Sequence, residues 1–182
     1  MSHTPVVKAA FLDRDGVINV DHGYVSTADQ FEFIDGVFAA CRHLQQQGYL
    51  LIVVTNQSGI GRGYYSEEQF WQLTAWMKQQ FAENGVNITD VFFCPHHPLN
   101  AEPPYRLDCN CRKPAPGMLL QAIEKYGIDA KQRLMLGDKK ADMQAAKAAG
   151  VGRKVLVLSG QSLSGEDKAS ADEIWPSIKA AL

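Results

Sequence analysis

The stretch Phe11-Leu12-Asp13-Arg14-Asp15-Gly16 follows directly from an apolar run that starts at Val6. Residues 6–12 are enough for one buried strand and too few for a helix. The two aspartates are therefore predicted to lie at the carboxyl end of a strand. In an open parallel α/β sheet, ligands bind at that edge. Gly16 then allows the chain to turn sharply away.

Two carboxylates at one strand tip repel each other unless a cation lies between them or one of them holds a proton. For a bare Asp-x-Asp pattern, the plain alternative is a solvated acidic turn. Three further stretches of the sequence favour a functional site over a solvated turn. Thr55 ends a second apolar run, Lys113 lies in Arg-Lys-Pro, and Asp138 follows a third run. Because parallel strands end at one edge, these side chains are predicted to face one crevice together with Asp13.

These motifs, in this order, resemble those of the haloacid dehalogenase superfamily of phosphotransferases over roughly residues 8–160. The resemblance implies an α/β fold, with one Rossmann-like parallel sheet and helices on both of its faces. It also implies that Asp13 is a nucleophile that forms an aspartyl-phosphate. Asp15 would then be the general acid and base, while Thr55 and Lys113 would hold the phosphoryl oxygens.

The same resemblance implies a Mg²⁺ ion on the carboxylates of Asp13 and Asp138 and on the main-chain carbonyl of Asp15. Hard oxygen ligands of this kind select Mg²⁺. A carboxylate and a phosphate oxygen repel each other by roughly 4 kcal/mol at about 4 Å and an effective dielectric near 20, so a cation there has a physical role. For Asp142, two roles stay open: orienting Lys113 or orienting a metal-bound water.

Composition narrows the class of protein. The 182 residues, 46% of them hydrophobic, suit a single domain over 1–182, which the resemblance implies is a phosphatase domain. The net charge of −2 gives no extended cationic field, so we expect no nucleic-acid partner. No apolar run reaches the ~20 residues of a membrane span. Residues 1–5 lack the features of an export signal, so we expect a cytoplasmic protein, and we expect it to be a monomer.

Periodicity and turn residues predict the remaining elements. Strands are expected at 49–54, 90–93, 133–136 and 154–158, with a small one at 174–175. Helices are expected at 35–48, 66–85 behind a Ser-Glu-Glu-Gln capping box, from 116 onward, in the alanine-rich stretch before Gly150, and at 177–182. Residues 17–33 and 161–170 are predicted to be loops. In the 66–85 helix, Trp71 and Trp76 are candidates to extend the buried stripe.

A second motif reads Cys94-Pro95-His96 and, twelve residues later, Cys109-Asn110-Cys111. Two tight pairs of sulfur and imidazole ligands favour a closed tetrahedral Zn²⁺ site, in a loop spanning 94–111 that has no periodicity of its own. The alternative is three reduced cysteines in a loop. His97 is a rival ligand, but His96 makes the two pairs symmetric. Cys41 lies apart and is predicted to be ordinary core.

The glycine-rich stretch 56–63 has a rival interpretation as a dinucleotide site. Its glycines follow the second strand and have the wrong spacing, so an approach of backbone amides to a phosphoryl group fits better. Substrate contacts are also expected from other loop residues. The candidates are Asp21, His22, Gly23 and Tyr24 after Gly16, Asn56, Gln57 and Ser58 after Thr55, and Arg112 and Lys139 beside the other motifs. From composition alone, a surface turn closed by Gly23 accounts equally well for the first group.

Neither usual insertion point of the superfamily has room for a cap domain, since one holds about twenty residues and the other holds the 94–111 loop. The resemblance therefore implies a capless phosphatase that acts on a sugar bisphosphate, with Arg112 taking the second phosphate in a bidentate fork. Phosphatases of histidinol phosphate share the core and the zinc loop and are the nearest alternative. A non-enzymatic phosphosugar-binding module is the alternative from another class.

Overall fold

A computed structural model describes residues 5–182, so most of the segment examined for an export signal lies outside it. The chain forms a six-stranded sheet in the order β3-β2-β1-β4-β5-β6, and every neighbouring pair is parallel. This is the doubly wound order in which β1 and β4 flank the point where the winding reverses. The strands are β1 Lys8–Leu12, β2 Tyr49–Asn56, β3 Asp90–Cys94, β4 Arg133–Gly137, β5 Arg153–Val157 and β6 Glu173–Trp175.

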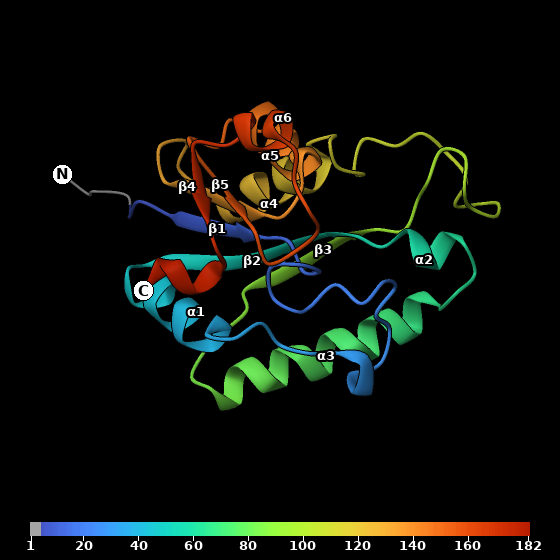
Figure 1. The fold of residues 1–182 in the computed structure, drawn as a ribbon, viewed down its shortest axis with the longest axis horizontal. Helices are drawn as coiled ribbons and strands as arrows, with labels where there is room; N and C mark the ends of the chain where they lie inside the picture. The colour runs from blue at the N-terminus through green and yellow to red at the C-terminus, as the bar shows by residue number, and fades with distance from the viewer. Residues whose placement is uncertain (1–4) are drawn as a thin grey trace.

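Helices cover both faces of this sheet, as the sequence predicts. Helices α1 (Val37–Gln46) and α3 (Glu67–Glu83) lie on one side, while α4 (Gly117–Tyr126) and α5 (Lys140–Ala148) lie on the other (Figure 1). The short α2 (Ser58–Gly61) lies beyond the end of β2, close to the loop that leads from β3 to α4 (Figure 1). The remaining elements are α6 (Gly165–Ala169) and the 3-10 turns Ala28–Gln30 and Ile178–Ala181.

Alternation along β1 explains the two apolar layers. Ala10 and Leu12 belong to the cluster that contains the buried residues of α1 and α3, whereas Ala9 and Phe11 belong to the cluster of α4 and α5. Successive side chains of a strand point to opposite faces, so a strand buried on both sides has no polar alternation. The predicted core position of Cys41 is confirmed, because its side chain is fully buried in the first cluster.

Several local expectations need correction. Strand β2 continues through Asn56, so Thr55 does not end the strand. It lies within the sheet and pairs with Phe93. Residues 58–61 form one helical turn, and the predicted loop at 161–170 contains α6, which starts with a Ser164–Asp167 capping box. Both helices are too short to show a 3.6-residue period. The final helix is a 3-10 turn, and Trp71 is 46% exposed, so it does not extend the buried stripe.

Candidate active site and metal centre

The carboxyl edge of the central strands holds the motif residues. Asp13 directly follows β1, and its amide donates to the Leu136 carbonyl of β4 at 3.0 Å. Asp138 directly follows β4, while Lys113 comes from the loop before α4. All three side chains are buried, as is Thr55. The structure therefore brings together the four positions that the sequence predicts to share one crevice.

Lys113 is the centre of this arrangement. Its Nζ atom donates to Asp13 Oδ1 at 3.0 Å, to the Val54 carbonyl at 2.8 Å and to Asp142 Oδ1 at 2.6 Å. The Asn56 side chain fixes the backbone of Lys113 from both sides, because it accepts from the amide at 3.0 Å and donates to the carbonyl at 3.1 Å. Although burial opposes its charge, the two carboxylates raise the pKa of Lys113, which keeps it a cation.

Asp142 connects Lys113 to the end of β4. Its other carboxylate oxygen, Oδ2, accepts from the backbone amides of Asp138 at 3.2 Å and Lys139 at 3.1 Å. A carboxylate held in this way has little freedom to swing toward a ligand. Of the two roles that the sequence leaves open for Asp142, the contact with Lys113 is the one present in the structure.

The carboxylates of this edge are suited to a divalent cation. Burial, with the nearby Asp142, raises the pKa of Asp13 to about 6, and burial with the charge of Asp13 raises the pKa of Asp138 to about 9. Within residues 5–182, both carboxylate oxygens of Asp138 are buried without a hydrogen-bond partner. Oxygens of Asp13, Asp138 and Asp142 lie within 4.8 Å of one another. A cation between them would satisfy the orphaned oxygens and offset the repulsion.

Two glycines make room for Asp138. Gly16, at φ +89°, and Gly160 approach its carboxylate so closely that a Cβ atom at either position would overlap Oδ2. The Ser159 hydroxyl donates to the Gly16 carbonyl at 2.8 Å, which ties the loop after β5 to the turn after β1. The turn that the sequence predicts at Gly16 is therefore needed both for its backbone angle and for the space it leaves.

Asp15 differs from Asp13 because its side chain reaches a pocket. Arg14 Nη2 and Asn19 Nδ2 each donate to Asp15 Oδ1 at 3.0 Å, and Gln57 Nε2 donates to Oδ2 at 3.3 Å. Gln57 also donates to the Thr55 hydroxyl at 2.8 Å. The two motifs are thus linked through one amide, which positions Asp15 beside Thr55.

The pocket at this edge has a volume of about 390 Å³. Ten of the sequence-predicted site residues line it: Asp15, Asp21, Gly23, Tyr24, Asn56, Gln57, Ser58, Arg112, Lys113 and Lys139. Sequence reasoning missed five others, namely Gly59, Arg62, Tyr65, Ala141 and Gln161. Arg62 lies in the glycine-rich stretch 56–63 and could have been found there. Gln161 carries no local signal, because only the packing of the loop after β5 brings it to Asp21, at 3.3 Å.

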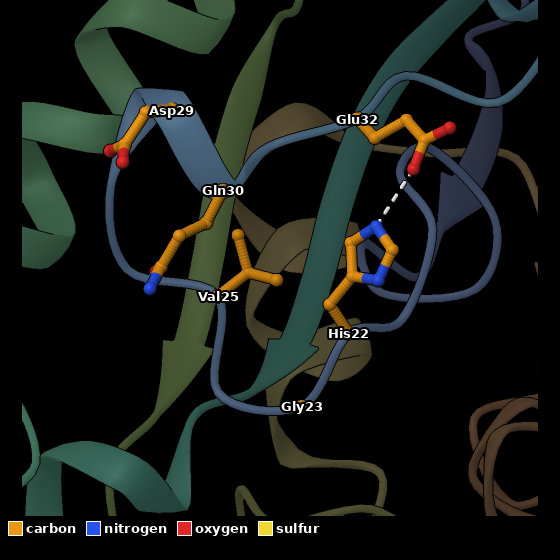
Figure 2. Close-up of a pocket in the computed structure, with 6 residues that line it drawn as sticks. All are labelled: His22, Gly23, Val25, Asp29, Gln30 and Glu32. Atoms are coloured by element: carbon orange, nitrogen blue, oxygen red, sulfur yellow. Dashed lines mark hydrogen bonds and ion pairs between the residues drawn. The ribbon is translucent and has the colours of Figure 1, made fainter.

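His22 does not line this pocket, although Asp21 and Gly23 on either side of it do. Its Nε2 atom lies 2.7 Å from Glu32 Oε2, and the pair lines a separate hollow of about 270 Å³ with Gly23, Val25, Asp29 and Gln30 (Figure 2). In a loop without regular structure, neighbouring side chains point in unrelated directions. Asp21 and Tyr24 therefore line the active-site pocket while His22 between them does not.

The predicted zinc ligands also come together. Cys111 Sγ lies 3.0 Å from Cys94 Sγ, 3.4 Å from Cys109 Sγ and 3.4 Å from His96 Nδ1. A tetrahedron with Zn–S bonds of about 2.3 Å has edges of about 3.8 Å, so the cluster has nearly the size of a zinc site. The Cys94 thiol lowers the pKa of Cys111 to about 5, which favours the thiolate that binds metals.

The neighbouring His97 is engaged elsewhere. Its Nδ1 atom accepts from the amides of Leu99 at 3.1 Å and Asn100 at 2.8 Å, and only His96 belongs to the cluster. The cluster is joined to the segment that carries Lys113, since the Arg112 amide donates to Cys109 Sγ at 3.4 Å. That segment is therefore anchored next to the four cysteine and histidine side chains.

Comparisons with known proteins agree with this site. A family model described as HAD-hydrolase-like matches residues 110–181. A D-glycero-β-D-manno-heptose-1,7-bisphosphate 7-phosphatase from Yersinia pestis is 52% identical over 175 residues, which are 96% of this chain and 93% of that protein. The phosphatase of the same name from Escherichia coli strain K12 is 52% identical over 172 residues, or 94% and 90% of the two chains.

Solved structures agree as well. A D,D-heptose 1,7-bisphosphate phosphatase from B. bronchiseptica, complexed with magnesium and phosphate, aligns with a TM-score of 0.82 at 29% identity and covers 96% of this chain and 95% of its own. The D,D-heptose 1,7-bisphosphate phosphatase of Burkholderia thailandensis aligns with a TM-score of 0.65 at 27% identity and covers 95% of this chain and 94% of its own.

No helix within 5–182 is long and apolar enough to cross a membrane.

Five stretches of the sequence resemble the same phosphatases. These are Asp13–Gly16, Asn19–Val25, Thr55–Gly59, Cys94–Pro98 and Cys109–Pro114. The structure gathers residues of all five stretches around one sheet edge and its anchored loop. With about half of its residues identical to these relatives over nearly their whole length, the chain belongs to the heptose-bisphosphate phosphatase family of the haloacid dehalogenase superfamily.

Proposed function

We propose that this chain hydrolyses the 7-phosphate of D-glycero-D-manno-heptose 1,7-bisphosphate and leaves the 1-phosphate in place. The observation that carries the proposal is the buried Lys113–Asp13 contact at the edge of a pocket lined by further cations. An ammonium beside a nucleophilic carboxylate offsets the repulsion between that carboxylate and a phosphate dianion. The relatives named above act on this substrate by name, and the resemblance assigns the reaction to nucleotide-heptose and lipopolysaccharide synthesis.

In the proposed reaction, a carboxylate oxygen of Asp13 attacks phosphorus and the bond to the sugar O7 breaks. Asp15 gives its proton to that oxygen, so the sugar leaves as an alcohol. Asp15 then takes a proton from water, which attacks the aspartyl-phosphate and releases inorganic phosphate and the free Asp13 carboxylate. Lys113 and the Thr55 hydroxyl hold the phosphoryl oxygens throughout.

Two metal ions complete the proposal. Asp13, Asp138 and the main-chain carbonyl of Asp15 would hold Mg²⁺, which when bound supplies positive charge to the transferring phosphoryl group. Zn²⁺ on the Cys94, His96, Cys109 and Cys111 cluster would have a structural role only. Its four ligands leave no open position, and it would order the segment that delivers Lys113.

Selectivity in a capless enzyme has to come from short loops around the pocket. Asp21, Gly23, Tyr24 and Ser58 line the side where sugar hydroxyls would lie, and Arg112 presents a guanidinium for the second phosphate. Histidinol phosphate instead carries a cationic amine, which Arg112 would repel. The intact motif set and the hydrolase relatives favour an enzyme over a binding module.

The substrate proposal is tested by kcat/KM for heptose 1,7-bisphosphate, fructose 1,6-bisphosphate and histidinol phosphate, with Mg²⁺ present. We expect the heptose bisphosphate to be preferred. Arg112→Ala should lower the ratio of kcat/KM for heptose 1,7-bisphosphate to kcat/KM for heptose 7-phosphate by about 10- to 100-fold, which is the contribution of a charge-assisted hydrogen bond. A preference for histidinol phosphate would contradict the proposal, and an unchanged ratio in Arg112→Ala would remove the assigned grip on the second phosphate.

A further inference from the structure

Arg62 is a cation of the active-site pocket that forms no ion pair among residues 5–182. It follows α2 and lines the pocket, as Arg112 does. Among residues 5–182 no ion pair includes Arg62, and its buried Nε atom has no hydrogen-bond acceptor. A guanidinium that is partly withdrawn from water and left unpaired loses hydration without compensation. An anionic ligand in the pocket would supply the missing acceptors.

Its position is fixed by contacts that lie away from the reacting carboxylates. A Cβ atom on the preceding Gly61 would lie 2.6 Å from the Pro95 carbonyl, so α2 is packed directly against the metal-binding loop. The Gly61 carbonyl also accepts from the Glu102 amide of that loop at 2.7 Å. The same loop carries Arg112, and the two guanidiniums are therefore held by one packed unit.

Tyr24, which also lines the pocket, contacts Arg62. The Arg62 guanidinium lies 5.8 Å from the centre of the Tyr24 ring, within cation–π range. Tyr24 has a φ of 51°, a backbone angle unusual for a residue with a side chain, and its ring packs edge-on against Tyr64 with centroids 4.8 Å apart. These contacts restrict the arginine without using its hydrogen-bond donors.

The charges of the pocket separate into two groups. Lys113 forms ion pairs with Asp13 and Asp142. In the proposed reaction it holds the phosphoryl group that is transferred. Arg62 contacts neither carboxylate and also lines a second, outer hollow with Arg106 and Glu102, which places it at the rim. Arg112 likewise forms no ion pair among residues 5–182, and its side chain donates only to the His96 carbonyl, at 3.5 Å. Two unpaired guanidiniums at the rim match a second phosphate dianion.

We propose that Arg62 is a specificity-determining residue that binds, together with Arg112, the phosphate of the substrate that is not hydrolysed. The inference rests on the proposed function in taking a sugar bisphosphate as the substrate. Planar guanidiniums can each offer two parallel N–H donors to phosphate, which a single lysine at this position could not. Arg62 would therefore act on the choice between bisphosphate and monophosphate rather than on the chemical step.

The test compares kcat/KM for heptose 1,7-bisphosphate with kcat/KM for heptose 7-phosphate in the zinc- and magnesium-loaded full chain. Arg62→Gln should lower this ratio by about 10- to 100-fold, mainly through KM for the bisphosphate. Arg62→Lys should keep part of the preference, because it retains the charge but loses the fork. Arg106→Gln removes the same charge from the neighbouring hollow and should leave the ratio as it is.

An unchanged ratio in both Arg62 variants would overturn the inference, as would an equal loss with the two substrates. Failure of the proposed function can be told apart from failure of this inference, because the wild-type chain would then show no preference for the heptose bisphosphate.

In that case, turnover of p-nitrophenyl phosphate is measured while fructose 1,6-bisphosphate or fructose 6-phosphate is added as a competing inhibitor. Arg62→Gln should weaken inhibition by the bisphosphate more than inhibition by the monophosphate, and equal weakening would contradict the assignment.

Discussion

Asp13→Asn is expected to lower phosphate release by about 10⁴-fold or more, because loss of a nucleophile removes the covalent route altogether. The amide has nearly the same shape as the carboxylate, but it neither attacks phosphorus nor binds a cation as an anion. The fold should survive. Lys113 keeps its 2.6 Å contact with Asp142, and the substitution removes a carboxylate whose pKa is raised by burial and by Asp142.

The measurement is release of inorganic phosphate from heptose 1,7-bisphosphate, with thermal unfolding as the check on folding. Asp90→Asn is the matched control, since Asp90 is also a carboxylate at a strand end but lies at the opposite edge, where it pairs with Lys125 at 2.7 Å. That variant should keep its activity. If Asp13→Asn retained near-normal turnover, the covalent assignment would be wrong.

Asp15→Asn distinguishes the role of Asp15 from that of Asp13. Loss of a general acid costs about 10²- to 10⁴-fold with an alcohol leaving group. A p-nitrophenyl leaving group needs no proton, so Asp15→Asn should form the aspartyl-phosphate from that substrate at a less reduced rate, whereas Asp13→Asn should remain inactive. Equal losses of phosphorylation rate with both leaving groups would contradict the acid role of Asp15.

Loss of a zinc ligand is expected to lower activity through a different route, the positioning of Lys113. We predict one tightly held zinc per chain, distinct from an exchangeable Mg²⁺, and a fall in activity of about 10²-fold in Cys111→Ser. The reason is indirect: misplacing one catalytic group costs about this much, and Lys113 lies two residues after Cys111. The Cys111–Cys94 contact of 3.0 Å would be lost with the sulfur atom of Cys111.

Elemental analysis of the purified protein measures the zinc, and phosphate release measures the effect on Lys113. Cys41→Ala is the control, because Cys41 is a buried cysteine of the other apolar cluster and should leave the zinc content at one per chain. A purified protein without zinc would contradict the assignment of the zinc site. A Cys111→Ser variant that lost its zinc and kept full activity would contradict the proposed effect on Lys113.

What the sequence determines by itself is the set of local signals that short segments carry. Uninterrupted apolar runs mark strands buried on both faces, and Asp13 and Asp138 follow from their places beside such runs. Lys113 is identified instead by the Arg-Lys-Pro motif that follows the cysteine-containing loop. The spacing of Cys94, His96, Cys109 and Cys111 likewise indicates four ligands for one site. In each case the information lies within a few residues, and the parallel topology alone brings the strand ends together.

Only the tertiary structure decides how side chains from distant segments point. Asp142 contacts Lys113 because α5 begins beside the catalytic loop, and His22 turns to Glu32 because the loop after Gly16 folds back on itself. Arg62 reaches the pocket through the packing of α2 on the metal-binding loop. These contacts join residues whose separation in sequence says nothing about their distance. Their geometry depends on the whole packed chain, so a local pattern can single out such a residue, as the glycine-rich stretch does for Arg62, but it cannot place the side chain.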